Sequence, residues 1–460
     1  MQPHTSDGTV EQNRSIPTTL ALGLSTFLIM FDVTAVLIAM PAIAKDIGLG
    51  VTGVAWVVDA YSVPFASALL ASGALADRFG RRRCMLAGNA VFLVASFACG
   101  LALSRPVLLG ARVVQGVGAA FMATGATALI SVAFSNVAQR SRAFGVVGVI
   151  SGVAMALGPT LGGYLASWVG WRWIFFANIP LCLALAIAVP RLVAETNHQQ
   201  GRRLDPLGIA LLTVSLGLVV DALLRRDGSL AVRAACLVGG ATAASLFVCQ
   251  QWRSPHPVFD PHVFATSVMV GVAALLTSIQ FGYWAVLIYL PLFLTSTLRM
   301  NVALAGTALL AATLPMLLVP LIGGRLATYW GWRRLFSIAF GLVTFGDVSL
   351  VIAALWDNPR MRLTATVAGM VVAGVGAALA NPQLSGVALA FAPSTQAGMA
   401  SATVLIVRQA GFAISIAALG ATLGAAGAAT GFVQPFALAA SVALLGMIAA
   451  QVLLPAKSAQ

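Results

Sequence analysis

The chain has 460 residues, of which 60% are hydrophobic and only 8% are charged, and its mean hydropathy is +0.96. Soluble domains carry about a quarter of their residues as charged side chains, so this composition excludes a soluble protein and predicts an all-α polytopic membrane protein. The net charge is +13, but the basic residues are spread among short loops, whereas nucleic-acid-binding proteins present a basic face. We therefore expect membrane lipids around the chain and no nucleic acid as a partner.

Fourteen apolar runs in the sequence are long enough to cross a membrane as helices. Between a polar tail, residues 1–17, and a C-terminal tail, residues 454–460, they cover approximately residues 18–41, 51–75, 84–103, 107–131, 142–168, 172–190, 204–224, 230–250, 266–294, 303–327, 334–355, 362–383, 400–424 and 430–453. We expect the N-terminal tail to be disordered. We expect no signal peptide, because the first apolar run is too long for the apolar region of a signal peptide.

Three ionisable residues lie inside the first four runs, where charge is costly. Asp32 lies nine residues before the end of the first run, Asp59 eight residues after the start of the second, and Arg112 five residues after the start of the fourth. At 1.5 Å per residue they lie about 14, 12 and 8 Å from the same membrane face. Burial disfavours a charged carboxylate and a nearby arginine favours it, so both aspartates are candidate proton carriers. The alternative is a structural ion pair.

The segment GALADRFGRRR, residues 73–83, separates the second run from the third and holds four arginines and one aspartate. An arginine at the membrane centre costs about 2.5–3.5 kcal/mol or more, so this segment is a loop. Its positive charge predicts a cytoplasmic location, and more lysines and arginines fall on that side than on the other. Because fourteen spans return the chain to its starting side, both termini are predicted to be cytoplasmic. The simplest interpretation of the loop is a topology anchor.

The fourth and fifth runs contain small residues at the spacing of close helix packing. In the fourth, Gln115 follows Arg112 by almost one turn and can face the same polar space, which makes it a candidate substrate contact. The fifth contains two Gly-x-x-x-Gly pairs and a proline that predicts a kink. These positions are Gly148, Gly152, Gly158, Pro159, Gly162 and Gly163. The alternative for both helices is packing alone.

Three segments of the chain return in the same order at nearly constant spacing. Residues 73–83 return as GRLATYWGWRR at 324–334, GVGAA at 116–120 returns at 374–378, and ALGPTLGG at 156–163 returns as ALGATLGA at 418–425. This repeat predicts two parallel six-helix halves, residues 18–190 and 251–453. Residues 191–250 then form a linker with two inserted helices.

The ninth run, IQFGYWAVLIYLPLFL, holds the candidate drug-facing surface of the second half. Gln280 and Trp284 are four residues apart and are expected to share a helix face, and Tyr283 adds aromatic area. Arg408 in the thirteenth run is a second candidate contact, followed by Asp347 and Asp221. The alternative is that the aromatic residues face lipid or the core.

The motifs of residues 31–180 resemble, in order, those of the 14-helix drug:proton antiporter branch of the major facilitator superfamily. They are FDVTAVLIAMPAI, WVVDAYSVPFA, the loop motif, RVVQGVGAA, GPTLGG and WRWIFFANIP. The resemblance implies that Asp32 and Arg112 take part in proton coupling and that Gly-Pro-x-x-Gly-Gly marks an exporter.

The resemblance also assigns a role to the charged loop between the second and third runs. It implies that the loop controls an inner gate by contacting the other half, through Gly73, Asp77, Arg78, Gly80 and Arg82. The second copy has Thr328 in place of Asp77 and Ala421 in place of Pro159, so the gate and the kink are expected in the first half only.

The function implied is proton-coupled export of lipophilic small molecules across the cytoplasmic (inner) membrane by a monomer. We expect protons and a small-molecule substrate as partners, with no enzymatic activity and no cofactor. We also expect no metal site, because the five cysteines have no metal-site spacing. A dedicated exporter of one endogenous metabolite or antibiotic is the alternative. A membrane sensor would need a soluble domain, for which no loop is long enough, and an ATP-driven pump would need a Walker motif.

Overall fold

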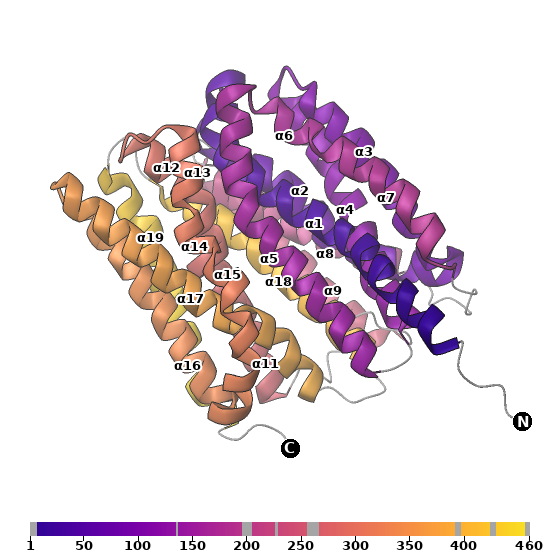
Figure 1. Cartoon of the computed structure of the whole chain (residues 1–460). Helices are drawn as coiled ribbons and strands as arrows, with labels where there is room; N and C mark the ends of the chain where they lie inside the picture. Colours follow the sequence, from indigo (N-terminus) through magenta and orange to yellow (C-terminus); the bar gives the residue numbers. More distant parts are fainter. Residues whose placement is uncertain are drawn as a thin grey trace, which may run out of the picture.

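The computed structural model describes residues 7–134, 137–195, 205–225, 229–254, 266–391, 397–423 and 429–455, and every regular element in these ranges is helical (Figure 1). The elements of the N-terminal half are α1 (Asp7–Ile47), α2 (Val51–Phe79), α3 (Arg81–Gly100), α4 (Arg105–Ala133), α5 (Val137–Trp168), α6 (Arg172–Phe176) and α7 (Asn178–Leu192). The inserted pair is α8 (Pro206–Leu224) and α9 (Leu230–Arg253). The C-terminal half comprises α11 (Ser267–Ile279), η1 (Gln280–Ala285), α12 (Val286–Ser296), α13 (Val302–Ala308), α14 (Leu310–Thr313), α15 (Pro315–Leu318), α16 (Pro320–Leu355), α17 (Pro359–Phe391), α18 (Ala397–Thr422), η3 (Ala429–Phe432) and α19 (Val433–Leu453).

Twelve helical segments in the described ranges are long and apolar enough to cross a membrane, which makes the chain a multi-pass membrane protein. The expected spans 51–75 and 303–327 are not among the twelve. Residues 51–75 lie in α2, which is a single helix of 29 residues. The stretch 303–327 is divided into α13, α14, α15 and the start of α16, although Leu309, Leu314 and Val319 between them keep a helical backbone. Pro315 and Pro320 lack the amide donors that uninterrupted helical hydrogen bonding requires.

The N-terminal tail also differs from its expected disorder, because α1 begins at Asp7. Residues 1–6 lie outside the described ranges. The polar segment is continuous with the first span, and extending an existing helix adds one hydrogen bond for each residue fixed, without a new nucleation cost.

The repeat found in the sequence is visible in the backbone. Gly80, between α2 and α3, has φ of +100°, and Gly331, at the equivalent position of the second copy, has φ of +76°. Both conformations favour glycine, because a side chain would clash there. Helix contacts repeat as well: a Cβ on Gly116 would overlap the carbonyl of Tyr61, and one on Gly374 would overlap that of Ala312.

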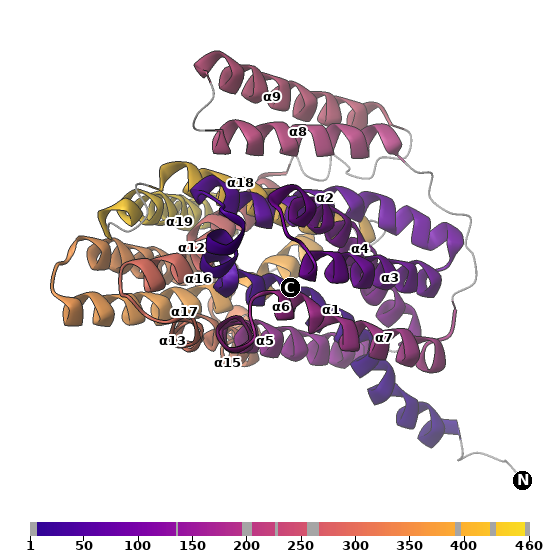
Figure 2. The same cartoon turned by 90° about the horizontal axis from the view of Figure 1, so that it is seen from above.

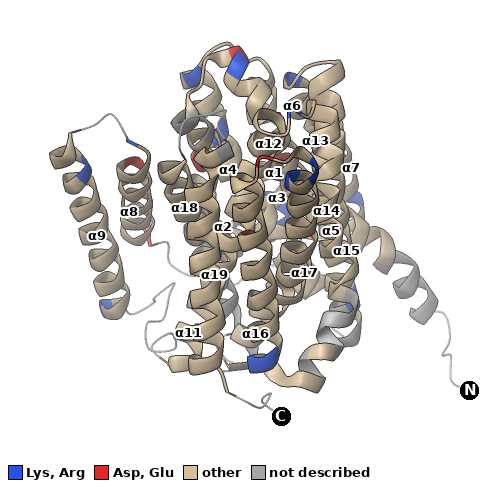
Figure 3. Cartoon of the chain, turned by 90° about the vertical axis from the view of Figure 1, so that its left-hand side faces the viewer, with Lys and Arg blue, Asp and Glu red and all other residues tan. Residues whose placement is uncertain are grey.

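The two ends of the bundle can be told apart by their loops. The loop end holds Gly80 and Gly331, and Arg333 there donates to the carbonyl of Leu454 at 3.0 Å. The far end joins α1 to α6, since Arg172 donates to Asp46 at 2.6 Å and to the Ala102 carbonyl at 3.0 Å. Most of the positions coloured as charged residues fall near these two ends, while the middle of the bundle is largely uncharged (Figure 3).

The inserted helices α8 and α9 lie beside the bundle as a hairpin (Figure 2). α8 packs against α2 of one half and α18 of the other, and α9 packs on α8. α2 also packs directly on α18, while α5 packs on α13, α14 and α15. The two halves therefore meet along α2–α18 on one side and along α5–α13 on the other.

Candidate functional site

An ion pair in the middle of the N-terminal half joins two of the predicted proton-coupling residues. Asp32 on α1 and Arg112 on α4 are 0% and 1% exposed, and Arg112 Nη1 donates to Asp32 Oδ2 at 2.6 Å. Arg112 Nε donates to the carbonyl of Val57 on α2 at 3.3 Å. Its guanidinium also lies 4.4 Å from the ring centre of Tyr61. One cation thus ties α1, α2 and α4 together.

Amide side chains complete the coordination of the Asp32 carboxylate. Its Oδ1 accepts from Gln115 Nε2 at 2.9 Å and from Asn178 Nδ2 at 2.8 Å. Gln115 also accepts from Arg112 Nη1 at 2.7 Å and donates to Ser96 Oγ at 2.9 Å. Gln115, predicted to be a substrate contact, is therefore a member of the ion-pair network, and we call these five residues the Asp32 cluster.

In the Asp32 cluster the charge of Arg112 is compensated by the Asp32 carboxylate alone. A buried charge pair is tolerable only when further hydrogen bonds satisfy its remaining donors and acceptors, and here each carboxylate oxygen has a charged or amide donor. Adding a proton to Asp32 would remove the anion that compensates Arg112. Arg112 would then be left with the Gln115 amide, the Val57 carbonyl and the Tyr61 ring.

Asp59 does not join this cluster. It is 0% exposed, and neither of its carboxylate oxygens has a hydrogen-bond partner among the described residues. Val57 and Tyr61, which touch Arg112, are four residues apart and share a face of α2, so Asp59 between them points to the other side of the helix. Ala55 shares that other side, and its Cβ would lie 3.5 Å from a Cβ on Gly420 of α18. Asp59 therefore lies on the side of α2 that faces the C-terminal half.

The loop that begins α3 is held within the N-terminal half by Glu195. The Glu195 carboxylate accepts from the backbone amides of Arg82 and Arg83 at 3.0 and 3.1 Å. Arg82 Nη1 donates to the carbonyl of Val193 at 3.0 Å. This differs from the expected contact of Arg82 with the other half. The first amides of α3 lack intrahelical partners and attract the Glu195 anion, which also lies 3.7 Å from Arg82 Nε and keeps this side chain in its own half.

The other loop positions contribute less to the described contacts. Arg78 is exposed, with its guanidinium 5.3 Å from the ring centre of Phe79. Gly73 has room, because a Cβ there would meet only the Thr124 methyl at 3.9 Å. The side chains of Asp77 and Thr328, on which the inner-gate interpretation depends, lie outside the described residues.

Replacing Glu195 by glutamine should lower the stability of the N-terminal half by about 1–2 kcal/mol, because the charge at the start of α3 is lost. Thermal unfolding of the purified chain in detergent would measure this. The matched control is Asp357→Asn, since Asp357 is fully exposed and 4.0 Å from Arg362, where an ion pair contributes little. Equal unfolding midpoints for both variants would contradict a capping role for Glu195.

The glycines of α5 face two different partners. A Cβ on Gly158 would overlap the Thr34 hydroxyl of α1, and one on Gly162 would lie 2.8 Å from Ala35 Cα. On another face, a Cβ on Gly152 would lie 3.4 Å from Leu317 Cα, and one on Gly163 would lie 2.9 Å from the carbonyl of Val302. The Pro159 carbonyl is covered by Gly306 of α13. α5 thus packs on α1 within its own half and on α13–α15 of the other.

Gly148 is the exception among the predicted packing positions. Among the described residues no atom lies within 4 Å of the place where its Cβ would be, and the residue is exposed. The expectation that Gly148 and Gly152 act as a packing pair is therefore wrong in this arrangement. The contacts of α5 with the C-terminal half run from Gly152 to Gly163, and Gly148 lies one turn beyond them toward the loop end.

The ninth predicted span contains a π-helix, η1, which the sequence pattern did not indicate. In a π turn hydrogen bonds run from i to i+5 instead of i to i+4, and Gln280 and Trp284 both lie in this turn. Gln280 and Tyr283 are buried, at 2% and 3% exposed, and Tyr283 donates to the Ala312 carbonyl at 3.0 Å. Trp284 is half-buried, with its ring 5.4 Å from that of Tyr283.

Arg408 on α18 contacts α17 of its own half. Its Nη2 donates to Ser385 Oγ at 3.2 Å and to the Asn381 carbonyl at 3.4 Å, and its buried Nε has no partner among the described residues. Asp221, at the end of α8, binds Arg225 through two hydrogen bonds of 3.0 and 3.1 Å. Neither residue joins the Asp32 cluster.

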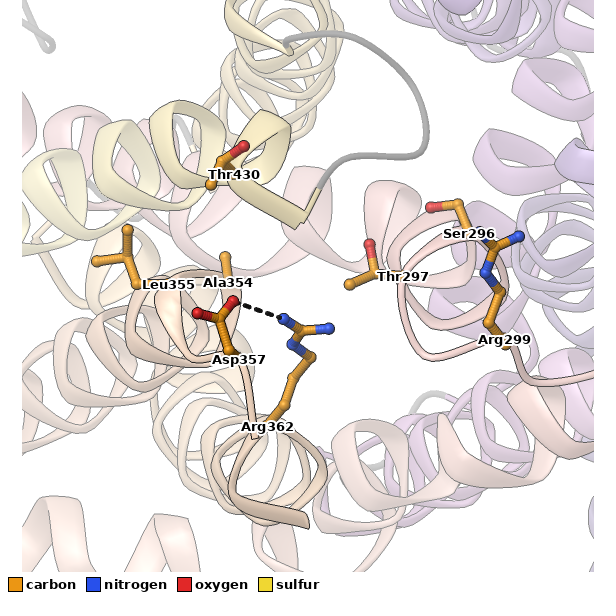
Figure 4. A pocket seen from close by; sticks show the side chains of 8 residues that line it. All are labelled: Ser296, Thr297, Arg299, Ala354, Leu355, Asp357, Arg362 and Thr430. Atoms are coloured by element: carbon orange, nitrogen blue, oxygen red, sulfur yellow. Dashed lines mark ion pairs between the residues drawn. The ribbon is translucent and has the colours of Figure 1, made fainter. Parts of the chain in front are cut away.

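A polar pocket of about 360 Å³ opens at the far end of the C-terminal half (Figure 4). It is lined by Ser296, Thr297, Arg299, Ala354, Leu355, Asp357, Arg362 and Thr430. Arg299 and Arg362 lie on opposite sides, and Arg362 pairs with Asp357 at 4.0 Å. This pocket contains none of the predicted drug-binding residues.

Several residues of the site were not identified from the sequence. Asn178 lies in the motif WRWIFFANIP, and an asparagine inside an apolar span is a signal of its own, because buried amides need partners. Ser96 and Glu195 carry no such signal. A serine is common in membrane helices, and Glu195 lies in a polar linker whose position only the packing of α7 determines.

The comparison with known proteins agrees with this architecture. The pattern of the Major Facilitator Superfamily matches residues 22–416. Multidrug resistance protein Stp of Mycobacterium tuberculosis is 32% identical over 413 residues, which cover 89% of this chain and 76% of that protein. The puromycin resistance protein pur8 of Streptomyces alboniger is 31% identical over 453 residues, which cover 94% of this chain and 90% of that protein.

The same fold is found among solved structures. The crystal structure of a D-xylose-proton symporter superposes with a TM-score of 0.69 and covers 96% of this chain and 99% of that one. At 14% identity this likeness concerns the fold alone. The match over residues 22–416 confirms the superfamily to which the sequence motifs point: the chain belongs to the major facilitator superfamily of membrane transporters.

Proposed function

We propose that this chain is a proton-coupled antiporter that exports lipophilic small molecules across the cytoplasmic membrane. The Asp32 cluster carries this proposal, because it places a fully buried carboxylate in a membrane-spanning helix with donors on two other helices, α4 and α7. Buried ionisable groups in membrane helices mark ion pathways and proton relays. The names of the relatives, a multidrug resistance protein and a puromycin resistance protein, support export of drugs.

The mechanism follows from the two different settings of the aspartates. Protonation of Asp32 weakens its bond to Arg112, so α1 and α4 gain freedom to shift. Asp59 lies on the side of α2 that faces α18, so a rocking motion of the halves changes its surroundings directly. Loading and release of protons is thereby coupled to alternating access at a site between the halves. Gln280, Tyr283, Trp284 and Arg408 are the residues of the second half that we assign to the substrate.

The finer organisation is part of the same proposal. It comprises fourteen spans, two halves over residues 18–190 and 251–453, an insertion between them, and both termini in the cytoplasm. The loop end then faces the cytoplasm, with Gly73, Asp77, Arg78, Gly80 and Arg82 at the inner gate. The far end, where Gly163 meets Val302, faces outward.

Inside-out membrane vesicles containing the chain provide the direct test. An imposed proton gradient, acidic inside, should drive uptake of a fluorescent lipophilic cation, and dissipating the gradient should release it. Vesicles without the chain are the control. Uptake that is unaffected by collapse of the gradient would contradict proton coupling.

A dedicated exporter is the second candidate, favoured by the relative that is named for resistance to the single antibiotic puromycin. A susceptibility panel of structurally unrelated drugs and dyes on cells with and without the chain separates the two. Protection against several unrelated lipophilic compounds supports broad export. Protection against one compound only supports the dedicated exporter.

A further inference from the structure

The C-terminal half contains a buried carboxylate that the proposed mechanism does not use. Asp347 on α16 is 0% exposed, and neither oxygen has a hydrogen-bond partner among the described residues. It lies eight residues before the last residue of α16, Leu355, and Asp59 lies eight residues after the first residue of α2, Val51. At 1.5 Å per residue both lie about 12 Å from the far end. Each half therefore has an unpaired carboxylate at the same depth.

The π-helix η1 covers Asp347. A Cβ on Gly282 would lie 3.3 Å from Asp347 Oδ2, 2.8 Å from Val343 Cγ1 and 3.0 Å from Ala443 Cβ. Gly282 thus lies close to the carboxylate, beside the apolar side chains of Val343 and Ala443. π turns within α-helices are frequent at functional sites. Here the π turn and its glycine bring one helix of the half directly against the carboxylate.

No charged partner for Asp347 is supplied by the described parts of the elements packed on α16, which are α15, α17, α19, η1 and η3. α15, α19 and η3 have no ionisable residue, and the only one in η1 is Tyr283, whose hydroxyl donates to the Ala312 carbonyl. Arg360 and Arg362 lie in the first turn of α17, where Arg362 donates to the Trp356 carbonyl. On α16 itself Arg333 and Arg334 lie more than ten residues away.

The repeat shows what is missing around Asp347. The spacing that relates Gly73 to Gly324 relates Ser96, a member of the Asp32 cluster, to Asp347. The spacing that relates the two GVGAA segments relates Arg112 to Met370 and Gln115 to Ala373. The second half thus places a carboxyl group at the position of the cluster serine but has neither the arginine nor the amide that stabilise an anion in the first half.

We propose that Asp347 is a further proton-binding site, in the C-terminal half, which holds a proton while η1 packs against α16 and exchanges it when η1 moves away. This inference deepens the proposed function, on which it rests. An isolated anion in an apolar setting costs several kcal/mol, whereas the protonated acid is neutral and fits the space beside Gly282. Proton loss breaks the carboxyl O–H bond and leaves an anion that requires water, so it requires α11–η1–α12 to separate from α16.

Infrared difference spectroscopy of the full chain in lipid tests this proposal without relying on transport. Wild type should show the carbonyl band of a protonated carboxyl group in an apolar setting. The component of this band that is lost in Asp347→Asn should remain in the control Asp59→Asn and should decline as pH rises. A band that is missing from wild type, or that persists at every pH, would overturn the proposal.

A second variant keeps the test decisive if Asp347→Asn fails to fold. Gly282→Ala places a methyl group against Asp347 and Val343, so it should loosen η1 and move the titration of the band to lower pH. An unchanged titration would contradict coupling to η1. The two proposals can fail separately. A band that titrates, in a chain whose vesicles show no proton-driven uptake, would support the Asp347 site and overturn the proposed function. Proton-driven uptake without a titrating band would support the proposed function and overturn the Asp347 site.

Discussion

Vesicles that contain the Asp32→Asn variant are expected to lose proton-driven uptake completely. Asparagine keeps the size of the side chain and can still bind Gln115 and Asn178, but it cannot release a proton. It also leaves Arg112, 1% exposed, without its counter-ion. Removing one partner of a buried ion pair costs about 3–5 kcal/mol, so the single variant should also unfold at a lower temperature.

A double variant separates coupling from stability. Asp32→Asn with Arg112→Gln removes both charges, so its unfolding temperature should return toward that of wild type while uptake stays lost. The matched control is Asp221→Asn, which breaks an aspartate–arginine pair at the exposed end of α8 and should change neither property. Proton-driven uptake at the wild-type rate in Asp32→Asn vesicles would refute the assignment, and Asp59 would become the proton carrier to test.

Leucine in place of Gly158 should abolish transport by forcing α5 away from α1. The new side chain would begin where the Thr34 hydroxyl already lies, and Ala35 N would be 3.3 Å from its Cβ. Overpacking of a close contact costs about 1–3 kcal/mol. Gly162→Leu, which meets Ala35 at 2.8 Å, should behave in the same way. Uptake into vesicles, normalised to the amount of inserted protein, measures the effect.

Gly148→Leu is the control on the same helix. A Cβ at Gly148 would have no described atom within 4 Å, so the leucine should be accommodated at the surface with transport close to wild type in this arrangement. If Gly148→Leu were as damaging as Gly158→Leu, the contact of α5 with α1 could not be the cause. If Gly158→Leu transported normally, that contact would have no role in the transport cycle.

The sequence by itself determined the class of the protein, the position of most helices and the repeat. Apolar runs long enough to span a bilayer leave the backbone no alternative to a helix, so these features follow from composition and length alone. Asp32 and Arg112 could be paired in advance for a related reason. They lie at similar depths inside apolar runs, where an opposite charge stabilises a buried ionised group.

Only the tertiary structure decided which side of a helix each residue presents and to which neighbour. Asp59 and Asp32 lie at similar depth in adjacent helices, yet the turn of α2 directs Asp59 away from Arg112 and toward the C-terminal half. Glu195 reaches the start of α3 because α7 ends beside it. The π turn of η1, which packs against α18, α19 and α16, has no signal in the local sequence pattern. Depth is set by position along one helix, whereas these contacts depend on the rotation and packing of several.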